Sequence, residues 1–222
     1  MVEMARGFHA ILFDLDGTLI RMPSPDFFDS ILVETLRKLC LPPPPRRERL
    51  RLWVSGREHW RILKSWGVTD PGLFWRTFDE FDLKLRSRLI RKGAIKPYVD
   101  VESLENLHLT VPLGLVTNTS PRVTLLEVKS FNLEKYFDVI IALGTERQED
   151  AKPEATGVLE AFKVLGCHPS DGLMVGDSDA DVLAGRNAGS TVAVIKRPHV
   201  RLRVKPDMYL NSLYTLQKLV DD

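Results

Sequence analysis

The chain has 222 residues, of which 44% are hydrophobic and 27% charged, and its net charge is +1. This is the composition of an ordinary globular protein, long enough for one good-sized core or for a core with a small accessory domain. The near-neutral charge predicts no general attraction to nucleic acid or to a membrane. No run approaches the roughly 18 apolar residues of a membrane span, and the N-terminus lacks the apolar stretch of a signal peptide. We therefore expect a cytoplasmic protein, with Cys40 and Cys167 reduced and partly buried, since their spacing is not that of a metal site.

The stretch from His9 to Ile20 combines a short apolar run with two acids. The apolar run from Ala10 to Phe13 is typical of a buried strand, which we expect within residues 10–15. Asp14 and Asp16 lie where this strand ends. Two acids two residues apart can place both side chains on one side of an extended segment, where they repel each other unless a cation or a shared proton compensates. Gly17 allows a sharp turn. A strand followed by an ordinary polar turn is the alternative interpretation.

Residues 21–95 have helical periodicity without a clear strand. Ser24-Pro25-Asp26 is typical of a helix start, with a capping Ser and Pro in the first turn. A second helical pattern covers 46–66, with a break expected at Ser55-Gly56, and a third covers 70–91. The sequence therefore predicts a helical insert over 21–95, the cap domain.

Strands and helices alternate beyond this insert. The expected strands are 113–117, 138–143, 172–176, 191–195 and 208–210, and the expected helices are 121–131, 154–165, 179–188 and 213–220. Such alternation predicts a parallel sheet with helices on both faces, which the strand at 10–15 must join because its backbone groups need partners. The fold class is therefore α/β: a Rossmann-like, three-layer core of residues 1–20 and 96–222 with the helical cap inserted.

Polar residues follow three of these strands and precede the helix at 154–165, and ligands bind at the carboxyl ends of strands in open α/β sheets. The four motifs are Asp14-Leu-Asp16-Gly-Thr18, Thr117-Asn118, Lys152-Pro153 and Gly176-Asp-Ser-Asp-Ala-Asp181. Carboxylates suit Mg²⁺, whereas Thr, Asn, Lys and the helix start at Ser120-Pro121 suit a phosphoryl group. One carboxylate attacking phosphorus while another moves a proton would give catalysis through an aspartyl-phosphate.

These four motifs, in this order, resemble those of the haloacid dehalogenase-like hydrolase superfamily, in its phosphatase type with a helical cap after the first motif, as in the phosphoglycolate phosphatases. The resemblance implies Asp14 as the nucleophile and a ligand of Mg²⁺, and Asp16 as general acid and then base, with its backbone carbonyl on the metal. It implies Asp177 as a further metal ligand.

The same resemblance implies that Thr117, Asn118 and Lys152 bind the phosphoryl group, and that Lys152 also neutralises charge during catalysis. Thr18 and Asp181 would contact these residues and not the substrate itself, with Asp181 orienting water or Lys152. We expect Asp179 at the surface.

Asp16 favours a phosphatase over a dehalogenase. The haloacid dehalogenases that the chain resembles lack an acid at this position, whereas phosphoryl transfer to water needs one. The related mutases carry a histidine soon after the first motif, and residues 19–35 contain none. We therefore expect a phosphatase acting on a small phosphorylated metabolite.

A phosphomutase, a dehalogenase and a non-catalytic relative that binds a phosphorylated ligand are the alternatives, and the near-zero charge disfavours nucleic-acid end processing. The expected assembly is a monomer or a homodimer.

The cap is basic between Arg37 and Lys64, with nine basic residues against two acids. Arg57, Arg61 and Lys64 have the four- and three-residue spacing of one helical face. If this face closes over the site, it would attract a second anionic group of the substrate, and Arg21 at the hinge could also reach it. The alternative is a solvated helix surface with the Arg stems covering nearby tryptophans.

Overall fold

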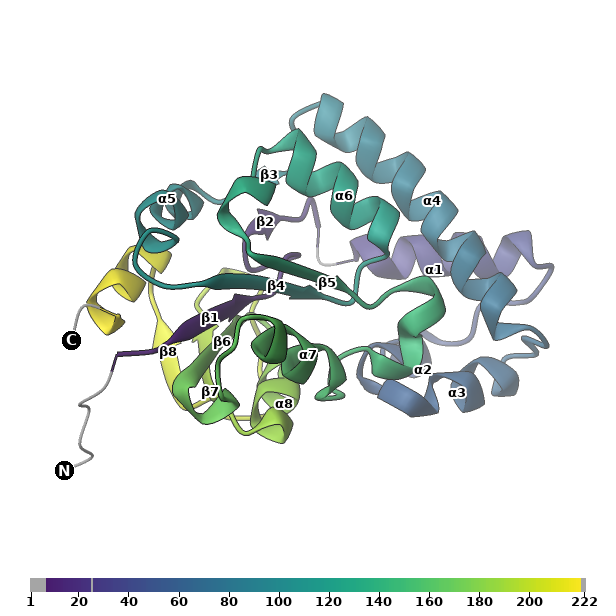
Figure 1. Ribbon diagram of the computed structural model, residues 1–222. Helices are drawn as coiled ribbons and strands as arrows, with labels where there is room; N and C mark the ends of the chain where they lie inside the picture. Colours follow the sequence, from purple (N-terminus) through teal and green to yellow (C-terminus); the bar gives the residue numbers. More distant parts are fainter. Residues whose placement is uncertain (1–6, 25, 221–222) are drawn as a thin grey trace.

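The computed structural model describes residues 7–24 and 26–220 and shows a six-stranded, wholly parallel sheet in the order β5-β4-β1-β6-β7-β8 (Figure 1). Its strands are β1 (Ala10–Phe13), β4 (Leu113–Thr117), β5 (Val139–Ala142), β6 (Gly172–Gly176), β7 (Thr191–Ile195) and β8 (Met208–Leu210). In the register, Phe13 lies opposite Leu115 on β4 and Val175 on β6. The residues that follow these three strands therefore emerge at one edge of the sheet. The predicted α/β fold is confirmed.

Alternate residues of β1 face two apolar layers, which explains its unbroken hydrophobic sequence. Ala10 and Leu12 belong to the layer that includes α7 and α8, and Ile11 and Phe13 belong to the layer on the other face, where α5 and α6 lie (Figure 1). These helices are α5 (Leu104–Leu107), α6 (Pro121–Ser130), α7 (Thr156–Val164) and α8 (Asp179–Ala188). Short 3-10 helices complete this part at Val99–Ser103, Glu134–Tyr136, Thr145–Asp150, Pro169–Asp171 and Leu213–Leu219.

The helical insert lies beside α6 and begins and ends in a two-stranded antiparallel ribbon (Figure 1). The ribbon pairs β2 (Ile20–Arg21) with β3 (Lys96–Pro97). The insert contains α1 (Phe27–Lys38), α2 (Arg46–Arg49), α3 (His59–Ser65), α4 (Pro71–Arg91) and 3-10 turns at Leu52–Val54 and Gly56–Glu58. Its apolar side chains form one continuous cluster with one face of the sheet. The division into two domains stays a prediction.

Two helix starts in the insert differ in how well the sequence predicted them. Helix α4 begins as expected, because Pro71 is its first residue and the Asp70 carboxylate accepts a hydrogen bond from the Leu73 N–H at 2.9 Å. Helix α1 begins at Phe27, after Asp26, which makes no side-chain cap, so the cap expected at Ser24 is wrong. Pro25 lies outside the described residues.

Three further expectations need correction. The pattern over 46–66 is divided into short helical pieces, although the predicted break is confirmed at Gly56, whose φ is +49°. The last helix, expected over 213–220, is a 3-10 helix. Cys40, expected to be partly buried, is exposed just beyond the end of α1. Within residues 7–24 and 26–220, no helix is both long and apolar enough to cross a membrane.

Candidate active site

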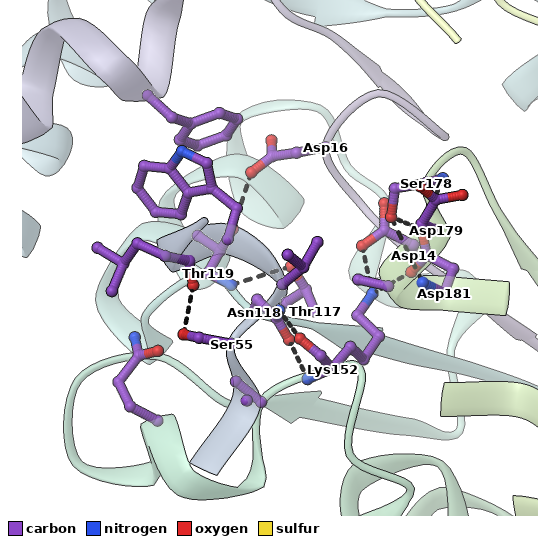
Figure 2. A pocket seen from close by; sticks show the side chains of 18 of the residues that line it. Asp14, Asp16, Ser55, Thr117, Asn118, Thr119, Lys152, Ser178, Asp179 and Asp181 are labelled. Carbon is purple, nitrogen blue, oxygen red and sulfur yellow. Dashed lines mark hydrogen bonds and ion pairs between the residues drawn. The ribbon is translucent and has the colours of Figure 1, made fainter. Parts of the chain in front are cut away.

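The four sequence motifs meet in one pocket at the carboxyl edge of the sheet, with a volume of about 430 Å³ (Figure 2). Asp14 follows β1, Thr117 ends β4 and Asp177 follows β6, so the parallel register brings these side chains together. The predicted residues that line the pocket are Asp14, Asp16, Thr117, Asn118, Lys152, Asp177 and Asp181.

Lys152 is the buried cation of the site. Its Nζ lies 2.6 Å from Asp14 Oδ1 and 2.6 Å from Asp181 Oδ1, and it donates to the Val116 carbonyl at 2.8 Å (Figure 2). Burial alone would lower the pKa of Lys152, but the two carboxylates outweigh it and hold that pKa above its ordinary value. Lys152 is therefore a fixed positive charge against the predicted nucleophile.

Three carboxylates converge beside this lysine. One oxygen each from Asp14, Asp177 and Asp181 lie within 4.8 Å of one another. Burial raises the pKa of Asp14 well above its usual value, against the opposing effect of Lys152, and the neighbouring Asp181 and Asp177 raise it further. Buried, mutually repelling carboxylate oxygens are the donor set that a hard divalent cation such as Mg²⁺ relieves. The residues present therefore fit the expected metal.

Asp181 is held by its own helix terminus as well as by Lys152. Its Oδ2 accepts hydrogen bonds from Ser178 Oγ at 2.5 Å and from the Ser178 backbone N–H at 3.0 Å, while Ser178 caps α8 in return. Both carboxylate oxygens of Asp181 are thus engaged, one by Lys152 and the other by Ser178. Thr18 Oγ1 donates to Asp14 Oδ2 at 3.0 Å, so Thr18 contacts the predicted nucleophile.

The tip of β1 needs a glycine. Gly17 has φ +89°, and a Cβ atom built there would stand 2.2 Å from Asp177 Oδ2. The turn after Asp16 therefore brings backbone against the side chain of the fourth motif, which no larger residue allows.

Two of the predicted phosphate-binding residues, Thr117 and Asn118, lie at the end of β4. Asn118 and Lys152 are joined by two reciprocal bonds of 2.8 Å, from the Lys152 N–H to Asn118 Oδ1 and from Asn118 Nδ2 to the Lys152 carbonyl. Thr117 Oγ1 accepts from the Thr119 N–H at 3.2 Å. Ser120, at the start of α6, lines the pocket with a buried hydroxyl that has no hydrogen-bond partner among the described residues. This helix start offers unused donors to an anion.

Asp16 lies apart from the Asp14, Lys152 and Asp181 group, although the sequence placed both acids of the first motif together (Figure 2). Its Oδ1 is 2.5 Å from Nη1 of Arg86, and its Oδ2 accepts from Thr119 Oγ1 at 2.8 Å. Both oxygens of the expected acid and base are therefore occupied by partners that the sequence analysis did not single out.

Arg86, on α4, is the centre of a buried charge cluster. It is fully buried, and it donates from Nε to Asp82 Oδ1 at 2.7 Å and from Nη1 to Glu127 Oε1 at 2.8 Å. Burial raises the pKa of Glu127 to about 8, against the lowering effect of Arg86. The spacing of Asp82 and Arg86 on one helix was the only available signal, since Asp16 and Glu127 lie far away in sequence.

His199 is another residue that the sequence analysis missed. It lies in the loop after β7, and its Nε2 is 2.6 Å from Asp177 Oδ2. Asp179, expected at the surface, is half-buried and accepts from the backbone N–H groups of Arg203 and Val204, so it fastens the same loop.

The basic cap residues do not line the pocket. Arg57 faces Glu154 at 3.4 Å and Arg61 faces Glu58 at 2.6 Å, and both Arg side chains are 65% exposed. Arg21 is exposed on β2. The structure thus places these three arginines on the outer surface.

Comparison with known proteins agrees with this geometry. The family described as haloacid dehalogenase-like hydrolase matches residues 11–195. The chain therefore belongs to the haloacid dehalogenase-like hydrolases.

Similar proteins include a phosphoglycolate phosphatase of Aquifex aeolicus, 31% identical over 96% of both chains, and a putative pyrophosphatase PpaX of Clostridium perfringens, 29% identical over 96% of this chain and 97% of the relative. Among solved structures, CbbY from Rhodobacter sphaeroides in complex with phosphate has a TM-score of 0.74 at 22% identity, covering 97% of this chain and 100% of that one. That likeness supports the fold, and the named relatives are hydrolases of phosphate compounds.

Proposed function

We propose that the chain is a Mg²⁺-dependent phosphatase that hydrolyses a small phosphorylated metabolite through an aspartyl-phosphate on Asp14. The observation that carries this proposal is the contact between Asp14 and the buried, charged Lys152, beside two further carboxylates. Lys152 lowers the pKa of Asp14 against the raising effect of burial, and so favours the ionised carboxylate that can act as a nucleophile. The relatives named phosphatase and pyrophosphatase support the same chemistry.

In this mechanism Asp14 attacks phosphorus and the bond to the leaving oxygen breaks. Asp16 donates its proton to that oxygen, and then takes a proton from the water that attacks the phosphoryl group and releases Asp14. Thr117, Asn118 and the start of α6 at Ser120 hold the phosphoryl oxygens, and Lys152 offsets their charge. Mg²⁺, held by Asp14, Asp177 and the backbone carbonyl of Asp16, would neutralise charge on the transferred group.

Phosphate release from 4-nitrophenyl phosphate with and without Mg²⁺ tests the proposal. We expect turnover that requires Mg²⁺ and is lost in Asp14→Asn, while Asp171→Asn, an exposed control, keeps it. Acid quenching of a reaction with ³²P-labelled substrate should trap a base-labile label on the wild-type protein and none on Asp14→Asn.

A non-catalytic relative gives a different result in the same assay. It would release no phosphate from any phosphoester at saturating Mg²⁺, yet would still be stabilised by added phosphate. A cytoplasmic location and a monomeric or homodimeric assembly belong to the same proposal, and fractionation and sedimentation would test them.

A further inference from the structure

The wall of the pocket contributed by residues 27–91 is aromatic and apolar. Its largest members are Phe28, Leu52, Trp53, Val54, Trp75 and Phe78. The ring of Trp53 lies 6.1 Å from that of Phe28 and 5.8 Å from that of Phe78, centre to centre. The aromatic side chains therefore form a continuous surface that faces the catalytic residues across the cavity.

One neutral hydrogen-bond donor interrupts this surface. Trp75 Nε1–H donates to His59 Nδ1 at 3.1 Å, so the proton of the uncharged imidazole lies on Nε2. Burial lowers the pKa of His59, against a smaller raising effect of Glu149. His59 is therefore a neutral donor at the pocket, suited to a carbonyl or hydroxyl oxygen.

The charges on this wall are negative. Asp79 and Asp82 line it, and no Lys or Arg from residues 27–91 does. Asp82 is paired with Arg86, whereas Asp79 accepts a hydrogen bond from Thr145 Oγ1 and forms no ion pair within the described part of the chain. Burial raises the pKa of Asp79 to about 6, so it is mostly ionised at neutral pH.

Such a wall repels a second anionic group. A carboxylate or a second phosphate seated against this wall would be desolvated against apolar rings and Asp79. The arginine that lines the pocket, Arg201, belongs to the loop after β7 and not to this wall, and its Nη1 donates to the backbone carbonyls of that loop. A flat ring would instead bury its faces against Trp53 and Phe78, and an ammonium or hydroxyl group could donate to Asp79. The cavity of about 430 Å³ is within the range of sites that hold ring-sized ligands.

We infer that the alcohol part of the substrate is a ring system, uncharged or cationic, seated against Trp53 and Phe78 with a donor group toward Asp79. This inference rests on the phosphatase activity proposed above. Such a substrate differs from phosphoglycolate and pyrophosphate, the small and multiply anionic compounds for which two similar proteins are named.

A matched set of benzylic phosphomonoesters tests the inference, because the esters differ in charge and share the leaving oxygen. We would measure kcat/KM for benzyl phosphate, 4-(aminomethyl)benzyl phosphate and 4-carboxybenzyl phosphate. Phosphoglycolate, which has no ring, would be measured beside this set. The first two should exceed the carboxylated ester and phosphoglycolate by roughly tenfold or more, as expected for one unpaired like charge at short range. Equal or faster turnover of the carboxylated ester or phosphoglycolate would overturn the inference.

Two variants connect the preference to the wall. Asp79→Asn, which is nearly isosteric, should raise kcat/KM for the carboxylated ester relative to benzyl phosphate by several-fold. Trp53→Leu should lower kcat/KM for benzyl phosphate and leave phosphoglycolate nearly unchanged, whereas Trp60→Leu, on the exposed side of α3, should change neither. Selectivity that is unaltered in Asp79→Asn would contradict the assignment, even if Trp53→Leu fails to fold.

The outcomes separate this inference from the function on which it rests. If hydrolysis depends on Asp14 but is faster for carboxylated esters, only the inference about the substrate is wrong and the proposed function stands. If no phosphoester is hydrolysed, the proposed function fails and the inference fails with it.

Discussion

Arg86 of α4 and Asp16 at the tip of β1 form an ion pair of 2.5 Å across 70 residues of sequence. The side chain of Arg86 is fully buried, and it also contacts Asp82 and Glu127. One guanidinium thus joins the insert, the sheet edge and α6 at the residue proposed to move protons.

The Arg86 cluster should be important for stability. In Arg86→Ala three acidic side chains lose the only cation that pairs with them among residues 7–24 and 26–220. Removal of one partner from a buried pair costs about 3–5 kcal/mol of unfolding free energy. Urea unfolding would measure the loss. Arg88→Ala, an exposed arginine on the same helix, should change stability by less than about 0.5 kcal/mol. Equal effects of the two variants would show that the cluster contributes nothing specific.

Asp16 should matter for turnover. Asp16→Asn keeps the size of the side chain and removes the transferable proton, so kcat should fall by about 10²–10⁴, with little change in KM. Steady-state kinetics would show this, with Asp26→Asn, an exposed acid, as the matched control. An Asp16→Ala protein with full turnover would rule out the role given to this residue.

Glu127 should make stability depend on pH. Its pKa is raised from about 4.5 to about 8 in the folded chain, so the protonated folded form is favoured between these values. The contribution of this group to stability therefore falls as pH rises through that range, and Gln, which cannot ionise, escapes the loss. The Tm of Glu127→Gln minus that of the wild type should increase by several degrees from pH 5 to pH 9, since about 1 kcal/mol moves Tm by roughly 2–4 °C at this chain length.

The control for this trend is Glu105→Gln, an exposed substitution on α5. It should show a Tm difference that stays constant with pH. A constant difference in Glu127→Gln as well would mean that the buried acid does not titrate in this range.

Metal binding should stabilise the folded chain. At Mg²⁺ one hundred times its Kd, the gain is about 2.7 kcal/mol, and chelation should remove it. Thermal unfolding with and without Mg²⁺ should show the gain in the wild type and in Asp171→Asn, and its loss in Asp177→Asn. A gain that survives in Asp177→Asn would place the metal elsewhere.

The central strands were predictable because they are buried on both faces and are therefore continuous apolar runs, as in β4 and β6. Strands β2 and β3 have two residues each, which is too short for an alternation of apolar and polar residues to be recognised in the sequence. The first, second and fourth motifs follow β1, β4 and β6, and their meeting was predictable because a parallel sheet places these strand ends at one edge. Lys152 lies well beyond the end of β5, between a 3-10 helix and α7.

What the sequence could not indicate were contacts set by packing between distant elements. Spacing alone predicts one helical face for Arg57 and Arg61. In the structure Arg57 lies in a 3-10 turn and pairs with Glu154, whereas Arg61 lies on α3 and pairs with Glu58, and both side chains are largely exposed. Arg86 meets Glu127 only because α4 packs beside α6, and His199 meets Asp177 only through the course of a long loop.

The antiparallel pairing of Arg21 with Lys96 means that the chain leaves the sheet and returns to it at neighbouring points. The entropy cost of closing such a segment grows only slowly with its length, by about 0.6 kcal/mol for each doubling. Insertions of quite different size could therefore be exchanged between Ile20 and Pro97 without a change in strand order. In such a chain, substrate preference can evolve separately from the machinery that breaks the phosphate bond.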